Sequence, residues 1–158
     1  IQEQILLIGT VIGEKGNARA LVDLMNEKVR ELKARIPQGE RKLRVLFYDA
    51  RGYVPGARSN FHSICELIGV VNVGAEHGVD SWARIDDETF LEWNPDIVIV
   101  PSGKHLEERL RKSPLLAHAR AVKEGRIYSI PHLYVSVTSQ FIVLSANRIA
   151  GLVYGEAR

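Results

Sequence analysis

The side chains best suited to binding a ligand follow three short apolar runs of the sequence. Each run ends in a loop that carries basic or aromatic residues, namely Arg51, Tyr53 and Arg58, then Lys104 and His105, then His132 and Tyr134. Guanidinium groups pair bidentately with carboxylate and phenolate-type oxygens. Three basic side chains and two tyrosines at one edge would therefore suit an anionic or oxygen-rich ligand. Any one basic residue alone is typical of ordinary surface, and only the cluster favours a site.

The stretch from Ser81 to Pro101 indicates that these loops share one edge of a sheet. It contains Trp82, a short helix capped by Asp86, and the apolar run Ile97–Val100. So short a run without polar alternation is typical of a strand covered on both faces in a parallel sheet. Ligands of such sheets bind outside the carboxyl ends of the strands. We expect Trp82 at this functional edge, although a tryptophan of the core or of a hydrophobic rim is an equal alternative.

The sequence has none of the motifs that would indicate catalysis. It contains no glycine-rich phosphate loop, no G-x-S-x-G elbow, and no close i, i+4 pair among its five histidines. The acidic run Asp86–Glu88 is explained by helix capping and by the helix dipole. We therefore predict a protein that is not an enzyme, with no catalytic residue, metal or cofactor.

Composition indicates one globular domain. The 158 residues are 25% charged and 46% hydrophobic, with a net charge of +2 that gives no case for a nucleic-acid partner. Cys65 is the single cysteine, and it is expected to be a buried structural residue. No apolar run approaches the length needed to cross a bilayer. The chain begins in the middle of an apolar pattern at Ile1, so we expect it to be part of a longer protein.

Two helices are predicted at the start of the chain. Isoleucines at helical spacing predict the first over 1–12, with Gly13 as its stop. The second should cover about 17–36, because Ala18, Val22, Met25 and the later apolar residues form one stripe before Pro37.

The remainder alternates between strands and helices. Strands are expected at 44–48, 97–100 and 127–130, with a short extended piece at 70–73 and a loop at 74–80. Helices are expected after the caps Ser59 and Asp86, over about 104–112 and 115–125, and from about Thr138. This order predicts an α/β three-layer domain with a mainly parallel sheet.

Five segments in order resemble a known family. They are RVLFYDARGYVPG, a helix ending LIGVVNVG, SWARIDDETFLEWNPDIVIVPSG, LLAHARAVKEGRIYSIP, and a closing helix. Together they resemble the helix-linked, class III substrate-binding proteins of ABC importers, which carry ferric siderophores, haem, cobalamin or metal ions. The resemblance covers the linker helices and the C-terminal, Rossmann-like lobe of that family. It implies interdomain linker helices at 1–36, a C-terminal α/β ligand-binding lobe at 37–158, and a missing N-terminal lobe.

The resemblance also assigns roles to particular residues. Trp82 lies where a cobalamin-binding relative has a tryptophan at the mouth of the cleft, and Glu88 matches the surface glutamate that family members present to the permease. The ligand-binding set is then Arg51, Tyr53, Arg58, Trp82, Lys104, His132 and Tyr134, and Glu88 is the permease-docking residue. A solvated helix residue is the alternative for Glu88.

The implied partners are an importer permease, an iron-complex or tetrapyrrole ligand, and the missing lobe. The implied location is periplasmic or extracytoplasmic, and any lipid anchor would be attached through a missing N-terminus. Exposure of an apolar face around Ile1, Ile5 and Ile8 would favour self-association. The alternatives are a metal-ion-binding member of the family and a free-standing α/β regulatory or interaction module.

Overall fold

A parallel sheet forms the centre of the molecule. The computed structural model describes residues 1–37, 41–102 and 104–155, without the side chain of Lys104. Within these residues, a four-stranded sheet runs in the order β3-β1-β5-β6, from strands β1 (Arg44–Phe47), β3 (Val71–Asn72), β5 (Ile97–Pro101) and β6 (Ile127–Ile130). Every neighbouring pair is parallel. The predicted parallel sheet and its three main strands are confirmed.

The chain reverses its direction across the sheet at β1. It first crosses to the edge strand β3 through α3 (Asn60–Ile68), and later returns to β5 on the other side of β1. A reversal of this kind leaves a crevice outside the carboxyl ends of the two central strands. The fold therefore favours a ligand site beyond Phe47 and Pro101.

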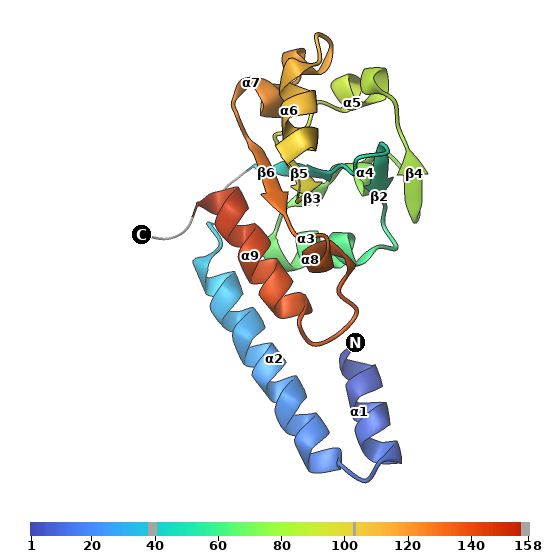
Figure 1. Cartoon of the computed structure of the whole chain (residues 1–158). Helices are drawn as coiled ribbons and strands as arrows, with labels where there is room; N and C mark the ends of the chain where they lie inside the picture. The colour runs from blue at the N-terminus through green and yellow to red at the C-terminus, as the bar shows by residue number, and fades with distance from the viewer. Residues whose placement is uncertain (38–40, 103, 156–158) are drawn as a thin grey trace.

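Two apolar layers cover the two faces of the sheet, because strand side chains alternate in direction. Val45 and Phe47 belong to the cluster formed with α2 (Lys15–Arg35), α3 and α9 (Ile142–Tyr154). Leu46 and Val98 belong to the other, formed with α5 (Asp87–Trp93), α6 (Lys104–Lys112), the 3-10 turn η1 (Leu116–His118) and α7 (Arg120–Lys123). Figure 1 shows the two groups of helices on opposite sides of the sheet. The predicted three-layer arrangement is confirmed.

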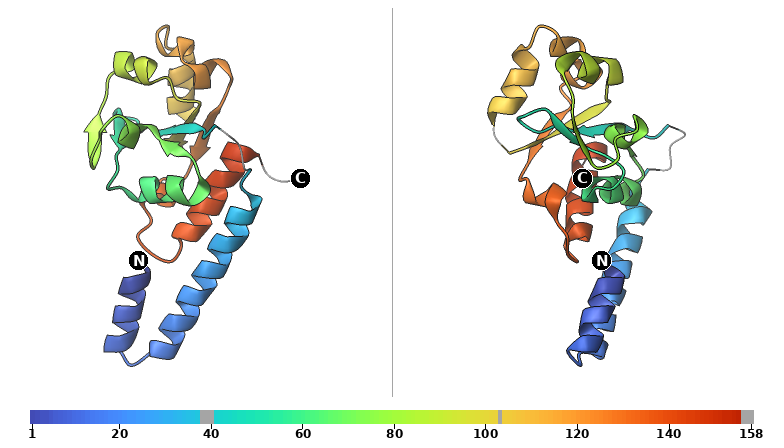
Figure 2. Two further views of the ribbon diagram at one scale, coloured as in Figure 1. Left: turned by 180° about the vertical axis from the view of Figure 1, so that it is seen from behind. Right: turned by 90° about the vertical axis from the view of Figure 1, so that its right-hand side faces the viewer.

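The N-terminal helices form a hairpin that projects from the lobe (Figures 1 and 2). α1 (Gln2–Val11) packs against α2, and α2 contacts α9. The two helices of the hairpin approach closely at Gly9, where an added Cβ would lie 2.3 Å from the Cβ of Ala18. As predicted, one apolar stripe of α2 faces inward, with Ala18, Val22, Met25 and Leu32 buried.

Helix α3 follows its sequence signals closely. The Ser59 hydroxyl accepts a hydrogen bond from the His62 N–H at 3.1 Å, and Gly69 ends the helix with φ of 72°. Cys65 lies on the inner side of α3 and is 1% exposed, as predicted. Burial raises the pKa of its thiol.

A two-stranded antiparallel sheet, absent from the sequence prediction, lies beside the parallel one. It pairs β2 (Tyr53–Pro55) with β4 (Trp82–Arg84), and Pro55 lies opposite Trp82. The pairing continues through Gly56, whose N–H donates to the Ser81 carbonyl at 2.6 Å. A Cβ at Gly56 would lie 2.0 Å from the Val79 carbonyl oxygen, so glycine permits this approach. The pair fixes Trp82 next to the loop that follows β1.

Three short helices differ from the prediction. The expected helix at 115–125 is divided into η1 and α7, because Ala119 is extended (ψ 142°) and the Asn94 side chain caps α7 by accepting the Arg120 N–H at 2.8 Å. α4 (Val73–Glu76) replaces part of the expected 74–80 loop, since the Asn72 side chain caps it.

The end of the chain also differs. The final helix begins at Ile142 rather than near Thr138, and the one-turn helix α8 (Leu133–Ser136) precedes it.

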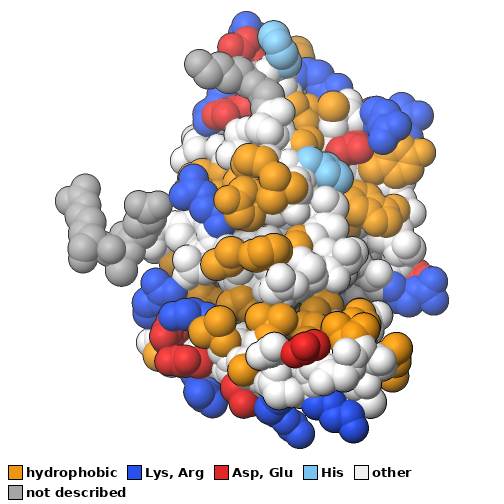
Figure 3. All heavy atoms as spheres, turned by 60° about the horizontal axis from the view of Figure 1, so that its bottom comes forward, with side chains coloured by type: hydrophobic (Ala, Val, Ile, Leu, Met, Phe, Trp, Pro, Cys, Tyr) orange, Lys and Arg blue, Asp and Glu red, His pale blue; other side chains and the backbone are white. Residues whose placement is uncertain are grey.

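Several large apolar side chains remain exposed on and near the hairpin. They are Leu7, Ile8, Val11, Ile12, Leu24, Leu133, Phe141 and Leu144. Figure 3 shows hydrophobic side chains gathered across this lower side of the molecule. The prediction was right for Ile8, which is 58% exposed, but wrong for Ile1 and Ile5, which are partly buried against the core. Among the described helices, none is both long and apolar enough to cross a membrane.

Candidate ligand-binding site at the carboxyl edge of the sheet

An open hollow of about 380 Å³ lies at the carboxyl edge of the sheet. It is lined by Asp49, Arg51, Tyr53, Trp82 and His132. Asp49 and Arg51 follow β1, Tyr53 and Trp82 come from the antiparallel pair, and His132 follows β6. The hollow thus lies where the strand-end rule and the reversal at β1 place a ligand.

A buried aromatic ring supports two of the lining side chains. Phe47, the last residue of β1, is fully buried, and its ring centroid lies 6.2 Å from that of Trp82 and 6.2 Å from that of His132. Both contacts are edge-on, with interplanar angles of 86° and 67°, an arrangement that aromatic pairs prefer. Trp82 is nevertheless 45% exposed. The edge-on contact therefore holds an indole whose remaining surface can lie against a ligand.

The Asp49 side chain organises the loop that carries Arg51 and Tyr53. Its Oδ1 atom accepts the N–H of Arg51 at 2.7 Å and the N–H of Tyr53 at 2.8 Å. The Asp49 N–H donates to the Tyr53 carbonyl at 3.0 Å, and the Gly52 N–H donates to the Asp49 carbonyl at 3.1 Å. A carboxylate that accepts nearby backbone N–H groups is a common way to fix a turn. Arg51 and Tyr53 are thus presented on a loop with a defined conformation.

Two arginines and a glycine hold the same loop from its other side. Arg84 donates through Nε to the Arg51 carbonyl at 3.1 Å, and Arg109 donates through Nη1 to the Ala50 carbonyl at 3.2 Å. Gly52 has a φ of 85°, and its carbonyl accepts the Ile85 N–H at 3.0 Å. A side chain at position 52 would be strained by this backbone conformation. The loop is tied to β4 and to α6 as well as to β1.

Arg51 is the exposed cation of the hollow. Its guanidinium carbon lies 5.7 Å from the Tyr53 ring centroid, and its Nε lies 3.8 Å from Asp49 Oδ2. The Arg51 side chain is 83% exposed, whereas that of Asp49 is 17% exposed. The guanidinium is therefore oriented by a cation–π contact and a long ion pair, both of which are weak at an exposed site.

The structure brings together four of the seven predicted ligand-binding residues, Arg51, Tyr53, Trp82 and His132. Arg58 instead pairs with Asp80 at 3.2 Å, with both side chains largely exposed. Tyr134 lies in α8 and packs against the core cluster. Lys104 begins α6, and its side chain lies outside the described part of the structure.

His105 and Asp49 differ from expectation in opposite ways. His105 is exposed on α6, outside the described lining of the hollow. Asp49 lines the hollow but was not predicted. Its position just after an apolar strand, and two residues before Arg51, is the turn signal that could have identified it.

Glu88 lies in the first turn of α5 and is exposed. It borders a second hollow, on the other side of the 49–53 loop, together with Asp86, Asp87, Arg109 and other residues. Asp86 caps α5 by accepting the Thr89 N–H at 2.8 Å, and hydrogen bonding by Thr89 lowers the pKa of the Asp86 carboxyl. Burial raises the pKa of Tyr48 in the floor of this second hollow, and the Asp87 charge adds to the effect. The capping role predicted for Asp86 is confirmed.

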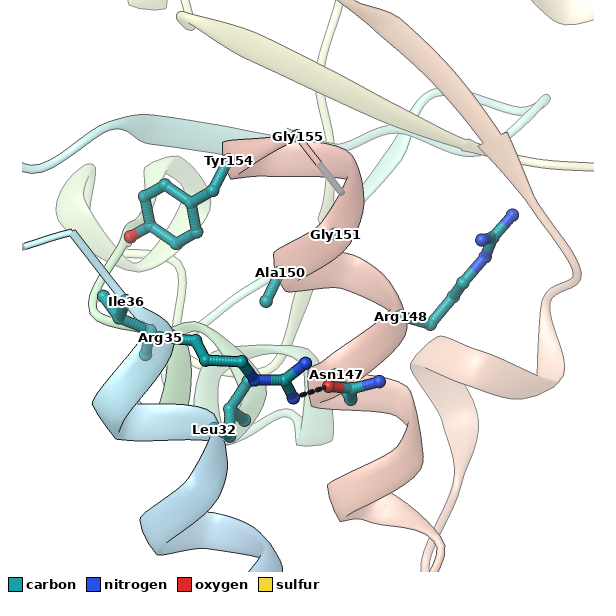
Figure 4. Close-up of a pocket in the computed structure, with 9 residues that line it drawn as sticks. All are labelled: Leu32, Arg35, Ile36, Asn147, Arg148, Ala150, Gly151, Tyr154 and Gly155. Carbon is teal, nitrogen blue, oxygen red and sulfur yellow. Dashed lines mark hydrogen bonds between the residues drawn. The ribbon is translucent and has the colours of Figure 1, made fainter. Parts of the chain in front are cut away.

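A third pocket, shown in Figure 4, lies between the end of α2 and α9. Its lining includes Leu32, Arg35, Asn147 and Tyr154, with a hydrogen bond from Arg35 to Asn147. Tyr154 donates to the Ile68 carbonyl, at the end of α3, at 2.8 Å. This pocket lies where the hairpin packs against the lobe, at the edge of the sheet where the strands begin. It does not share residues with the hollow around Trp82.

No group of three or more His, Cys, Asp or Glu side chains that could hold a metal ion occurs within the described residues. The chemistry of the hollow around Trp82 is instead that of aromatic surfaces beside one guanidinium and one carboxylate. It is suited to noncovalent binding of a molecule with a flat or apolar face and polar oxygens.

Comparison with solved structures finds the same fold in binding proteins. A possible iron-binding periplasmic protein from Staphylococcus epidermidis has a TM-score of 0.88 at 22% identity, and the match covers 97% of this chain and 61% of that one. A periplasmic heme-binding protein from Roseiflexus has a TM-score of 0.83 at 19% identity, with 99% and 63% covered. An Fe3+-hydroxamate transport-system protein from Saccharomonospora viridis has a TM-score of 0.82 at 20% identity, with 97% and 55% covered.

These matches span nearly all of this chain but only about three-fifths of the length of the similar structures. None of the curated protein sequences compared with the chain matched it.

The sequence itself matches a family model described as periplasmic binding protein over residues 1–134. That family and the similar structures are binding proteins rather than enzymes, in agreement with the prediction from the missing catalytic motifs. The hairpin and the α/β lobe have the same fold as these similar structures. The chain therefore belongs to the periplasmic binding protein family.

Proposed function

We propose that this chain is the C-terminal lobe, with its linker helices, of the substrate-binding component of an ABC importer for an iron complex or a tetrapyrrole. The observation that carries the proposal is the hollow in which Arg51, Tyr53, Trp82 and His132 meet at the reversal point of the sheet. The proposed ligand class comprises ferric siderophores, haem and cobalamin. Residues 1–36 serve as interdomain linker helices in this proposal, and residues 37–158 as the ligand-binding lobe.

The shape and chemistry of the hollow support this ligand class. Tyr53 and Trp82 are 39% and 45% exposed and line the same hollow, and exposed apolar surface gathered in one place is typical of a binding site. A macrocycle or a siderophore backbone offers flat apolar area to such rings, and its carboxylate or other oxygens can accept from Arg51. The similar structures described as heme-binding and Fe3+-hydroxamate transport proteins support the same classes.

The openness of the hollow supports a second, facing lobe. An open hollow of about 380 Å³ on one lobe cannot surround a macrocyclic ligand. Binding sites generally bury most of their ligand. We propose that the second lobe supplies the other wall. The 158-residue chain alone should then bind at least roughly tenfold more weakly than the two-lobed protein, because about half of the contacts are lost.

The proposal is tested by titrating the two-lobed protein with haemin, a ferric hydroxamate and cyanocobalamin while following tryptophan fluorescence. All three ligands absorb light and quench a nearby indole. Trp82 lies in the hollow, whereas Trp93 is 9% exposed and stacked on His77. We expect saturable quenching that Trp93→Phe retains and that Trp82→Phe reduces. Quenching by none of the three ligands, or equal quenching after Trp82→Phe, would contradict the proposal.

The partner of the proposed component is the importer permease, docked through Glu88. The exposed position of Glu88 in the first turn of α5 supports this assignment. A charge at such a rim chiefly sets the docking register and the rate of encounter. The proposed location is periplasmic or extracytoplasmic, as for the family.

A metal-ion or oxyanion ligand is the second candidate. A similar structure from Haemophilus influenzae is described as a molybdate-binding protein, and Arg51 could pair with an oxyanion. Titration with molybdate in the same fluorescence experiment distinguishes this candidate. Saturation by molybdate, with no response to the iron complexes, would favour it.

A further inference from the structure

We propose that Asp49 determines the charge selectivity of the hollow, as the counter-charge of Arg51 as well as the organiser of its loop. Asp49 and Arg51 are the carboxylate and the guanidinium among the described lining residues, so their formal charges cancel. The inference is that the hollow favours ligands with little net charge over strongly anionic ones. It rests on the proposed function for the class of ligand.

The two carboxylate oxygens of Asp49 have separate roles. Oδ1 accepts the N–H groups of Arg51 and Tyr53 at 2.7 and 2.8 Å, which accounts for the shape of the loop. Oδ2 faces the guanidinium of Arg51, with Nε at 3.8 Å. The conformation of the loop and the charge beside Arg51 can therefore be changed independently by substitutions at Asp49. Asparagine keeps an oxygen at the Oδ1 position and replaces the charged Oδ2 with a neutral amide.

The guanidinium of Arg51 is exposed, so a ligand can compete with Asp49 for it. The side chain is 83% exposed and rests over the Tyr53 ring, so a ligand can approach it without displacing the core. An anionic ligand has to compete with Asp49 for the guanidinium, and it also meets the repulsion of the Asp49 charge. A neutral ligand meets neither effect. Asp49 thus lowers affinity for anions selectively.

A simpler explanation is that Asp49 only stabilises the turn and has no effect on which ligands bind. In that case Asp49→Asn should leave the charge preference of the hollow unchanged, because the Oδ1 acceptor is retained. Asp49→Ala should disturb the loop under either explanation, since the N–H groups of Arg51 and Tyr53 lose their acceptor. The asparagine variant is therefore the informative one, and circular dichroism checks that it folds like the wild type.

The first test needs no ligand. Quenching of Trp82 fluorescence by iodide and by neutral acrylamide is measured in the 158-residue chain with Trp93→Phe, where Trp82 is the remaining tryptophan. Asp49→Asn should raise the iodide-to-acrylamide ratio of quenching constants about twofold, since one negative charge near Trp82 is removed. Arg51→Met should lower the ratio by a similar factor. Glu107→Gln, which removes a carboxylate paired with Arg111 at 3.0 Å on α6, is the control and should have little effect.

The second test compares two iron complexes of different charge in the two-lobed protein. A ferric tris-catecholate carries three negative charges, whereas a ferric tris-hydroxamate such as ferrichrome is neutral. Asp49→Asn should improve the affinity for the catecholate relative to the hydroxamate by about fivefold, and Arg51→Met should reduce the same ratio. If both complexes bind, an unchanged ratio for both variants would overturn the proposal; if only one binds, an unchanged affinity for that complex in both variants would leave the iodide measurement to decide.

The two tests separate failure of this inference from failure of the proposed function. If neither complex binds the wild type, the iron-complex function fails, and iodide quenching still decides whether Asp49 sets the charge of the hollow. If iodide quenching is the same in wild type, Asp49→Asn and Arg51→Met, the charge assignment is wrong whatever the ligand.

Discussion

Arg51 is carried on the 49–53 loop, whereas Glu88 lies across that loop from the hollow around Trp82, and the two residues are expected to serve different partners. Arg51 borders both hollows, whereas Glu88 borders only the one between the loop and α5. Ala50, in the wall between them, is held by Arg109 of α6. A substitution at Glu88 should therefore leave the ligand hollow intact. This separation allows docking and ligand binding to be tested independently.

Glu88→Arg should impair transport without changing ligand affinity. Removal of an exposed charge pair costs about 1 kcal/mol, and reversal adds repulsion against a basic group of the permease. We expect reconstituted uptake at limiting binding-protein concentration to fall by roughly fivefold or more. The matched control is Glu66→Arg, since Glu66 is also an exposed helical glutamate (70%) but lies on α3, across the sheet. Equal uptake by both variants and the wild type would return Glu88 to the status of a solvated helix residue.

The residues of the hollow were only partly predictable, for reasons that differ from case to case. Arg51, Tyr53 and His132 follow strand ends, and the parallel sheet brings those ends together. Arg58 also follows β1, but the pairing of Gly56 with Ser81 and the ion pair with Asp80 carry it away from the hollow. Such contacts join positions more than 20 residues apart, and no local pattern encodes them.

At the scale of elements, α3 depends on a cap that also joins it to the preceding loop. The Ser59 hydroxyl accepts the His62 N–H and donates to the Gly56 carbonyl at 2.6 Å. Ser59→Ala should destabilise the protein by about 1–2 kcal/mol, because a helix N–H and a carbonyl both lose a partner. Urea unfolding followed by circular dichroism measures this change.

Ser63→Ala is the matched control for the cap. Ser63 lies one turn further along α3 and is exposed. Alanine has a higher helix propensity than serine, so this variant should be neutral or slightly stabilising. Equal loss of stability in the two variants would show that Ser59 acts through something other than capping.

Elements with strong local signals were predicted well, and those that depend on distant contacts were not. The three main strands are mostly apolar runs of four or five residues, and α2 and α3 have clear stripes and stops. The split between η1 and α7 depends on a cap supplied by Asn94, and α4 depends on the buried Asn72. β2 and β4 are three residues each, with exposed positions that give no apolar run. Their pairing is decided by the fold and not by propensity.

At the scale of the whole molecule, the exposed apolar side chains of the hairpin predict self-association of this chain. Ile8 and Val11 of α1 are 58% and 76% exposed, and Ile12, which caps that helix, is 64% exposed. We expect light scattering of the 158-residue chain to show species larger than a monomer at micromolar concentration. Val11→Glu together with Ile12→Lys should restore the monomer, because charges oppose burial of that stripe.

Matched substitutions test the specificity of this effect. Val29 lies on α2 and is partly buried against the core, so a charge there should lower stability instead of solubilising the surface. A wild-type chain that is monomeric at all concentrations would contradict the prediction. A monomeric protein in which the second lobe is present would be consistent with it, since that lobe could cover the stripe.

The close packing of Gly9 on Ala18 has a mechanical consequence. It holds α1 and α2 in close contact, so we expect the hairpin to move as one rigid unit. The hairpin is attached to the lobe where Arg35 donates a hydrogen bond to Asn147. α2 contains 21 residues and is therefore about 31 Å long. A rotation of about 5° at the anchored end would move the far end by about 3 Å. If residues 1–36 link two lobes, as we propose, the helix acts as a lever arm, and small rotations at its base alter how closely the facing lobe approaches the hollow.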